Sequence, residues 1–133
     1  MTHHLLTDHV QTADWKSEKH VPIIDCPDQF KKDEFTKVTV TIGKAVAHPN
    51  TTEHHIRWIV VYFLPEGSKF AFQVGRMEFC AHGESAGGPN TGPVYTHHEA
   101  CVSAKINLPG TLFAVAYCNI HGLWQSSKDI TVA

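Results

Sequence analysis

Apolar runs of strand length, each followed by a turn signal, constrain the fold of this chain more than any other feature. No segment of helical length repeats its apolar residues with the 3.6-residue period of an amphipathic helix. β-Branched and aromatic residues instead collect in short runs bounded by Pro, Gly and Ser. The runs cover residues 35–42, 56–64, 70–74, 77–81, 100–108, 112–118 and 129–133. About seven short strands predict an all-β fold, an immunoglobulin-like antiparallel β-sandwich.

The length and charge of the chain limit its organisation and its partners. A chain of 133 residues with 42% hydrophobic and 18% charged residues indicates one globular domain. We expect residues 1–12 to form a polar tail and residues 13–133 to form a single domain. The formal net charge of -2 argues against a nucleic-acid partner. No apolar run approaches the ~18–20 residues of a membrane helix, and the first residues lack the features of a secretory signal.

The four cysteines indicate a reducing compartment. Cys26, Cys80, Cys101 and Cys118 include no CxxC pair, which argues against a zinc ribbon or a rubredoxin-type iron centre. Their spacing does not resemble the disulfide framework of a small secreted protein, so we expect a cytoplasmic protein with reduced thiols. Cys26, Cys80 and Cys101 fit no motif, and we expect them to be small buried apolar side chains.

Histidine is unusually frequent, at 11 of 133 residues, and it is the commonest metal ligand. The strongest local motif is Cys118-Asn119-Ile120-His121-Gly122. Two ligands three residues apart can face one metal when the chain turns between them, and Gly122 permits such a turn. A buried cysteine beside an unrelated histidine is the alternative interpretation.

Two further segments carry histidines beside predicted strands. His48 follows one strand and His54 precedes the next, so both lie at the loop end of the sheet, where functional sites are usually built. His54 and His55 are neighbours on an extended chain and should point in opposite directions, so one of them is expected to face the metal. The third segment, Ser17-Glu18-Lys19-His20-Val21-Pro22, places a carboxylate, an ammonium group and an imidazole side by side. Each segment alone could also be a polar surface loop.

Taken together, the three segments favour iron as the metal. One thiolate with several imidazoles suits iron, copper or zinc rather than magnesium or calcium. A structural zinc site closes with four ligands, whereas this chain offers five candidates and a nearby carboxylate. A blue-copper site would use fewer histidines and usually a methionine after the cysteine. Both methionines, Met1 and Met77, precede Cys118.

The three motifs also resemble those of the superoxide reductases. The resemblance runs from about residue 12 to the end of the chain. It is closest to the short, single-iron neelaredoxin type, which corresponds to the desulfoferrodoxin iron-binding domain. The matching segments are Glu18-Lys19-His20-Val21-Pro22, His48-Pro49-Asn50 with His54, and Cys118-Asn119-Ile120-His121-Gly122-Leu123-Trp124. Because residues 1–12 contain no cysteine, the extra four-cysteine iron centre of longer relatives is not expected.

The resemblance implies a mononuclear non-haem iron (Fe2+/Fe3+) that reduces superoxide to hydrogen peroxide by one electron. His20, His48, His54 and His121 would be its equatorial ligands, and Cys118 its axial thiolate. Glu18 would occupy the position opposite the sulfur in the oxidised state, and Lys19 would be the cation beside that position, which makes both catalytic residues. The family also implies rubredoxin or a similar small redox protein as the external electron donor, a homotetramer and an immunoglobulin-like sandwich.

Two other functions remain open at this point. A cupredoxin-like electron-transfer protein or metal carrier would need neither an open coordination position nor Lys19. A structural domain with unrelated histidines would hold no stoichiometric metal. We expect the remaining histidines of the tail (His3, His4 and His9) and the pair His97-His98 to be solvated.

Overall fold

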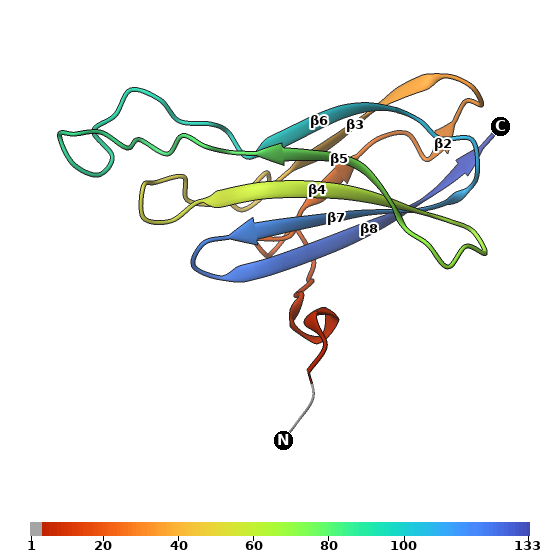
Figure 1. Cartoon of the computed structure of the whole chain (residues 1–133), viewed down its shortest axis with the longest axis horizontal. Coiled ribbons are helices and arrows are strands. Elements are labelled where there is room, and N and C mark those ends of the chain that lie inside the picture. The colour runs from red at the N-terminus through yellow and green to blue at the C-terminus, as the bar shows by residue number, and fades with distance from the viewer. Residues whose placement is uncertain (1–3) are drawn as a thin grey trace.

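The structure, a computed structural model, describes residues 4–133 and consists of two β-sheets that face each other (Figure 1). Its elements are the 3-10 turn η1 (Leu6–His9) and the strands β1 (Ile23–Asp25), β2 (Gln29–Phe30), β3 (Phe35–Thr41), β4 (Ile56–Pro65), β5 (Phe72–Glu78), β6 (Glu99–Lys105), β7 (Gly110–Cys118) and β8 (Gly122–Val132). The smaller sheet has the strand order β1-β3-β6, and the larger sheet has the order β2-β8-β7-β4-β5. The predicted all-β, immunoglobulin-like sandwich is confirmed.

The core lies between the sheets and follows the alternation of their strands. In β7, Leu112, Ala114, Ala116 and Cys118 are buried, and the residues between them are half-buried. Since successive side chains of a strand point to opposite faces, Cys118 shares its face with the core residues of β7. Each fully buried aliphatic side chain of such a core contributes about 1.5–3 kcal/mol. The sulfur of Cys118 is therefore fixed by the packing of the strand that ends with it.

Three regions of the chain differ from the sequence prediction. The runs at 70–74 and 77–81 form one strand, β5, which pairs with β4 across a register shift between Val61 and Tyr62. The last strand, β8, begins at Gly122 and not at residue 129, because its polar middle pairs along the whole of β7. The segment at 13–34, in which the sequence predicts no strand, contains the short strands β1 and β2, and β2 pairs with β8 in parallel. The sandwich is therefore mainly, but not wholly, antiparallel.

The connections that carry the predicted ligands meet at one end of the sandwich. In the larger sheet β7 is antiparallel to both β4 and β8, so the end of β7, the start of β4 and the start of β8 coincide. Cys118 is the last residue of β7, and Ile56 pairs with it at the start of β4. The connections at 42–55, 79–98 and 119–121 therefore lie at the same end. This antiparallel order brings residues far apart in the sequence together.

The N-terminal segment leaves the body of the sandwich at the side of β8 (Figure 1). Its residues Leu5 and Leu6 are exposed, whereas Gln11 forms a parallel bridge with Trp124 of β8. The division into a tail at 1–12 and a domain at 13–133 stays a prediction, and the bridge of Gln11 adds one contact between the two parts. Within residues 4–133, no helix combines the length and the apolar character that crossing a membrane requires.

Candidate metal centre

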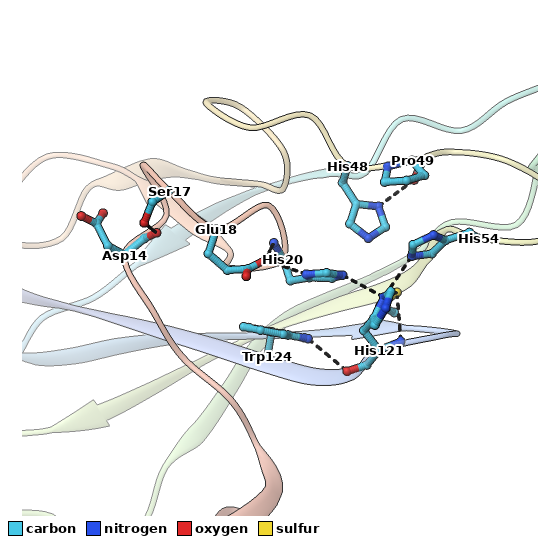
Figure 2. A network of polar contacts seen from close by, with 10 residues as sticks. Asp14, Ser17, Glu18, His20, His48, Pro49, His54, His121 and Trp124 are labelled. Atoms are coloured by element: carbon cyan, nitrogen blue, oxygen red, sulfur yellow. Dashed lines mark hydrogen bonds and ion pairs between the residues drawn. The ribbon is translucent and has the colours of Figure 1, made fainter.

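Four potential ligands converge at the loop end of the sandwich. His20, His54, Cys118 and His121 each offer one ligand atom, and these atoms lie within 4.8 Å of one another. The Nε2 of His20 is 3.2 Å from Nδ1 of His121, which is 3.3 Å from Nε2 of His54. Figure 2 shows these imidazoles and that of His48 pointing toward one another from three segments of the chain. The structure thus brings the three sequence motifs together.

The turn between β7 and β8 places Cys118 and His121 side by side. The backbone N–H of His121 donates to the sulfur of Cys118 over 3.4 Å, and Nδ1 of His121 lies 3.9 Å from the same sulfur. Gly122 closes the turn with a φ of 80°, a conformation that glycine adopts without strain. An N–H bond to a thiolate withdraws electron density and lowers the donor strength of the sulfur. The buried sulfur is therefore positioned and electronically tuned by the turn itself.

His48 stands beside the cluster with an unused ring nitrogen. Its Nδ1 lies 2.6 Å from the carbonyl oxygen of Pro49, to which it donates, so Nε2 carries the lone pair. This Nε2 is buried and has no hydrogen-bond partner among the described residues. The ring is 4.9 Å from the rings of His20 and His54, centroid to centroid. A buried acceptor without a partner is costly, and a metal ion bound by His20 and His54 would satisfy it.

Glycine permits the position of His48. A Cβ on Gly43 would lie 2.6 Å from the backbone nitrogen of His48, and Gly43 has a φ of +79°. Only glycine fits this close approach without a shift of the neighbouring backbone. The connection that follows β3 can therefore fold back tightly enough to bring His48 over the cluster.

Glu18 and Trp124 orient His20 from its two sides. Oε1 of Glu18 accepts from the backbone N–H of His20 over 3.0 Å and lies 2.7 Å from its Nδ1. The indole of Trp124 stacks on the His20 ring at 4.8 Å, and its Nε1 donates to the carbonyl oxygen of His121 over 3.2 Å. A carboxylate on one ring nitrogen fixes the tautomer and aims the other nitrogen at the metal. The structure thus places Glu18 behind His20, outside the converging ligand atoms.

Three imidazoles of the centre, those of His20, His48 and His54, are biased toward their neutral form. Burial lowers the pKa of His48 to about 3, and burial also lowers the pKa of His20 and His54. The hydrogen bond that His20 donates to Glu18 opposes this shift at His20. The positive charge of Lys19 adds to the lowering of the pKa at both His20 and His54. Neutral imidazoles keep the lone pairs that bind a metal. Lys19 is therefore near enough to the cluster to act on it electrostatically.

The donor set fits one transition metal ion. It consists of a thiolate sulfur, Nδ1 of His121 and the Nε2 atoms of His20, His48 and His54. Mixed nitrogen and sulfur ligands favour iron, copper or zinc over magnesium or calcium. Five protein donors leave one position of an octahedron for a small ligand.

The sequence prediction missed the role of Asn119, which lies beside the centre. Asn119 accepts from the backbone N–H of His55 through Oδ1 over 2.9 Å, and its Nδ2 donates to the carbonyl oxygen of Glu53 over 2.8 Å. It therefore ties the turn of Cys118 and His121 to the backbone on both sides of His54. The motif contains Asn119, but its partners are distant in the sequence and leave no local signal.

Some expectations about the other histidines and cysteines are wrong. His98 is buried against His48, with ring centroids 5.8 Å apart, although we expected it to be solvated. Cys80 and Cys101 are exposed, and only Cys26 is the buried apolar side chain that we expected. His4 and His9 are exposed as expected, and His3 lies outside the described residues. An alternating pattern predicts the face of a strand, but it does not predict burial in a loop such as that of His98.

Comparisons with known proteins agree with this geometry. The family model described as desulfoferrodoxin matches residues 12–127. The neelaredoxin of Megalodesulfovibrio gigas is 60% identical over 127 residues, which cover 96% of this chain and 98% of the relative. A crystal structure from Thermotoga maritima has a TM-score of 0.97 and 55% identity, covering 98% of this chain and 99% of its own. The superoxide reductase (neelaredoxin) of Archaeoglobus fulgidus in the reduced form has a TM-score of 0.86 and 51% identity, covering 92% and 98%. This chain therefore belongs to the desulfoferrodoxin family, as a member of its neelaredoxin type.

Proposed function

We propose that this chain is a superoxide reductase, an oxidoreductase that converts superoxide to hydrogen peroxide with one electron and two protons. The observation that carries the proposal is the convergence of four imidazoles and one thiolate, including the buried, unpartnered Nε2 of His48. The ligands of the mononuclear non-haem iron would be His20, His48, His54, His121 and Cys118. The names of the relatives, neelaredoxin and superoxide reductase, support the same activity.

The iron, when bound, supplies the electron that superoxide takes up. Cys118 contributes a thiolate that donates electron density from its buried position, as a thiolate does in some haem sites. The N–H of His121 restrains that donation through its 3.4 Å contact with the sulfur. The electron donation of the thiolate is thus moderate. A moderate donation favours reduction of the substrate without cleavage of its O–O bond.

Lys19 attracts the substrate to the centre. Superoxide is an anion, whereas the chain as a whole has a formal net charge of -2, so the attraction must be local. Lys19 is half-buried and adjacent to His20, and its charge acts on the rings of both His20 and His54. A positive group at the mouth of a small site raises the association rate of an anionic substrate.

Glu18 has two roles in this proposal. In the structure it accepts a hydrogen bond from His20 and orients the ring. Its side chain remains 31% exposed, so the carboxylate is also accessible to a bound iron and would be a further ligand of it. Glu18 would thus either orient the ligand His20 through a hydrogen bond or itself be a ligand of the iron.

Four features of the chain support an external electron donor, a homotetramer and a cytoplasmic location. Its four cysteines include no CxxC pair, so an external protein, rubredoxin or a similar carrier, would resupply the electron. His121 and Ile120 are exposed beside the buried Cys118, which supports electron entry at this end. Half-buried aromatic residues on the outer face of the larger sheet, Trp58 and Tyr117, support the homotetramer. The free thiols support a cytoplasmic location.

The visible spectrum of the oxidised protein tests the proposal. We expect stoichiometric iron and a thiolate-to-ferric charge-transfer band, which Cys118→Ser removes and Cys80→Ser, at an exposed thiol, preserves. A steady-state assay with reductant should yield one hydrogen peroxide for each superoxide consumed. A protein without iron, or a band that persists in Cys118→Ser, would refute the proposed centre. Electron transfer without superoxide consumption would favour a cupredoxin-like carrier.

A further inference from the structure

The connection between β5 and β6, residues 79–98, packs against the loop that carries His48 and His54. None of the three ligand motifs includes this connection, which contains four glycines, at positions 83, 87, 88 and 92. Figure 1 shows it extending beyond the sheets beside the β3–β4 connection. The contacts between the two segments are polar and specific, and most of them involve His82 or Asn90.

His82 is the buried anchor of this contact, with 3% of its surface exposed. Its Nδ1 lies 3.1 Å from Oδ1 of Asn50, and its carbonyl oxygen accepts from the hydroxyl of Thr52 over 2.7 Å. Its ring also stacks on that of His55, with centroids 3.4 Å apart and planes 5° from parallel. Asn50, Thr52 and His55 lie between or directly beside the two ligands of the loop. His82 therefore contacts the ligand loop at three points.

Asn90 adds a second, more exposed set of contacts. Its Oδ1 accepts from the backbone N–H of Thr52 over 2.8 Å, and its own N–H donates to the Thr52 hydroxyl over 3.1 Å. Its Nδ2 donates to both carboxylate oxygens of Glu53, the residue before His54, over 3.1 and 2.9 Å. Asn90 has a φ of 59°, a left-handed conformation that asparagine tolerates better than most residues. The hydroxyl of Thr52 thus links Asn90 to His82.

We propose that His82 and Asn90 are positioning residues of the metal centre, which hold the loop of His48 and His54 in its ligating conformation. The inference rests on the proposed function, because it takes these two histidines as iron ligands. His82 acts through Asn50, Thr52 and His55, and Asn90 acts through Thr52 and Glu53. The β5–β6 connection is thereby a structural part of the centre, although it supplies no ligand.

The physical reason is the conformational freedom of the loop. The connection from β3 to β4 spans residues 42–55 and includes no strand. Ordering each loop residue costs about 1–2 kcal/mol, and iron binding would have to offset that cost if the loop were free. Contacts that order the loop beforehand remove this cost from binding and restrict the positions of the two imidazoles. Removing the contacts should therefore speed iron release and alter the ligand field.

Release of ferrous iron to a chromogenic chelator, together with the charge-transfer band of the oxidised protein, tests the inference. His82→Ala removes the ring that contacts Asn50 and His55, and we expect release about 10-fold faster, with a shifted band. Thr52→Val, nearly isosteric, removes the hydroxyl link, and we expect about 3-fold faster release. His82→Gln, which keeps a polar side chain of similar reach, should recover part of the loss.

Thr111→Val is the matched control, because the hydroxyl of Thr111 donates to Asp129 over 2.8 Å at the opposite end of β7. It should release iron at the wild-type rate. If His82→Ala and Thr52→Val also release iron at that rate with an unchanged band, the inference is wrong while the proposed centre stands. If His82→Ala does not fold, Thr52→Val decides alone. A wild-type protein without the iron band would overturn both the inference and the proposed function.

Discussion

Two imidazoles of the centre, those of His48 and His20, are held by contacts on their far side. His48 donates from Nδ1 to Pro49, and His20 is held by Glu18 and Trp124. These contacts fix which nitrogen carries the lone pair before any metal binds. Burial keeps the rings neutral, so the protein does not have to lose protons from these rings when it binds iron at neutral pH. The orientation and the neutral form of these two rings therefore suit the binding of a cation.

Lys19 should control how fast superoxide reaches this centre. We expect Lys19→Ala to lower the second-order rate constant about 10-fold at low ionic strength and to flatten its dependence on salt. Lys16→Ala is the matched control, because Lys16 lies in the same segment but over the ring of Trp15. Pulse-radiolysis or stopped-flow kinetics at several salt concentrations measure the effect. Equal rates for both variants at low salt would remove Lys19 from the mechanism.

His98 should make the stability of the metal-free protein depend on pH. Burial lowers the pKa of His98 from 6.5 to about 4 in the folded state. Between these values the unfolded chain binds more protons than the folded chain, so the free energy of unfolding falls as the pH falls from about 6.5 to 4. We expect His98→Gln to reduce this slope in denaturant titrations, and His97→Gln, at an exposed neighbour whose charge also lowers this pKa, to reduce it less. Equal slopes in all three proteins would contradict the burial of His98.

At the scale of the elements, the β7–β8 turn and the start of β4 are joined by Asn119. Its backbone N–H donates to the carbonyl oxygen of His55 over 3.2 Å, and its side chain makes two further bonds to the same segment. The amide thereby ties the turn that carries Cys118 and His121 to the backbone that carries His54. The side chain of Asn119 thus adds to the β4–β7 pairing that sets the relative position of the two motifs.

Asn119→Ala should destabilise the metal-free protein by about 1–3 kcal/mol, because it leaves the N–H of His55 and the carbonyl of Glu53 without their partner. Denaturant unfolding gives this difference directly. Asn107→Ala is the control, since Asn107 also makes two side-chain bonds, both to the exposed Asp33. We expect a loss below about 1 kcal/mol there. A loss at Asn119 no larger than that at Asn107 would refute the proposed link.

The sequence predicts strands whose apolar residues alternate. It does not predict strand segments that depend only on backbone pairing with a neighbouring strand. Val38, Val40 and Ile42 predict β3 because one face of that strand is core. The middle of β8 is polar, so no apolar period marks its start, and its length depends on pairing with β7. The convergence of the candidate ligands could be predicted because the three motifs match those of the superoxide reductases in order and spacing. Asn119, His82 and His98 could not, because their roles depend on contacts between distant segments.

At the scale of the whole molecule, the antiparallel order of the sheets concentrates the chemistry at one end. The strands end or begin at residues 41, 56, 78, 99, 118 and 122, and the loops between them meet there. The remainder of the sandwich is a core that fixes the strand ends. The N-terminal segment is the exception, because it leads away from the sheets and its Gln11 pairs with β8 beside Trp124 (Figure 1).

Truncation separates the two parts of that N-terminal segment. Leu5 and Leu6 are 69% and 68% exposed, so removal of residues 1–9 should leave the metal-free protein equally stable. Gln11 donates to the carbonyl of Leu123 over 3.0 Å and accepts from the N–H of Gln125 over 2.8 Å. Removal of residues 1–12 deletes both bonds beside Trp124 and should cost about 1–2 kcal/mol.

Thermal unfolding measures the stability of both truncated proteins, and sedimentation of the same samples shows whether either truncation dissociates an assembly. If the shorter truncation is as destabilising as the longer one and also dissociates an assembly, Leu5 and Leu6 are buried between subunits. If neither truncation changes stability, the bridge of Gln11 contributes nothing and the predicted boundary at residue 13 holds. We expect a loss of stability only in the longer truncation. That result would place the start of the domain at Gln11, where the chain pairs with β8, the strand whose Trp124 stacks on the ring of His20.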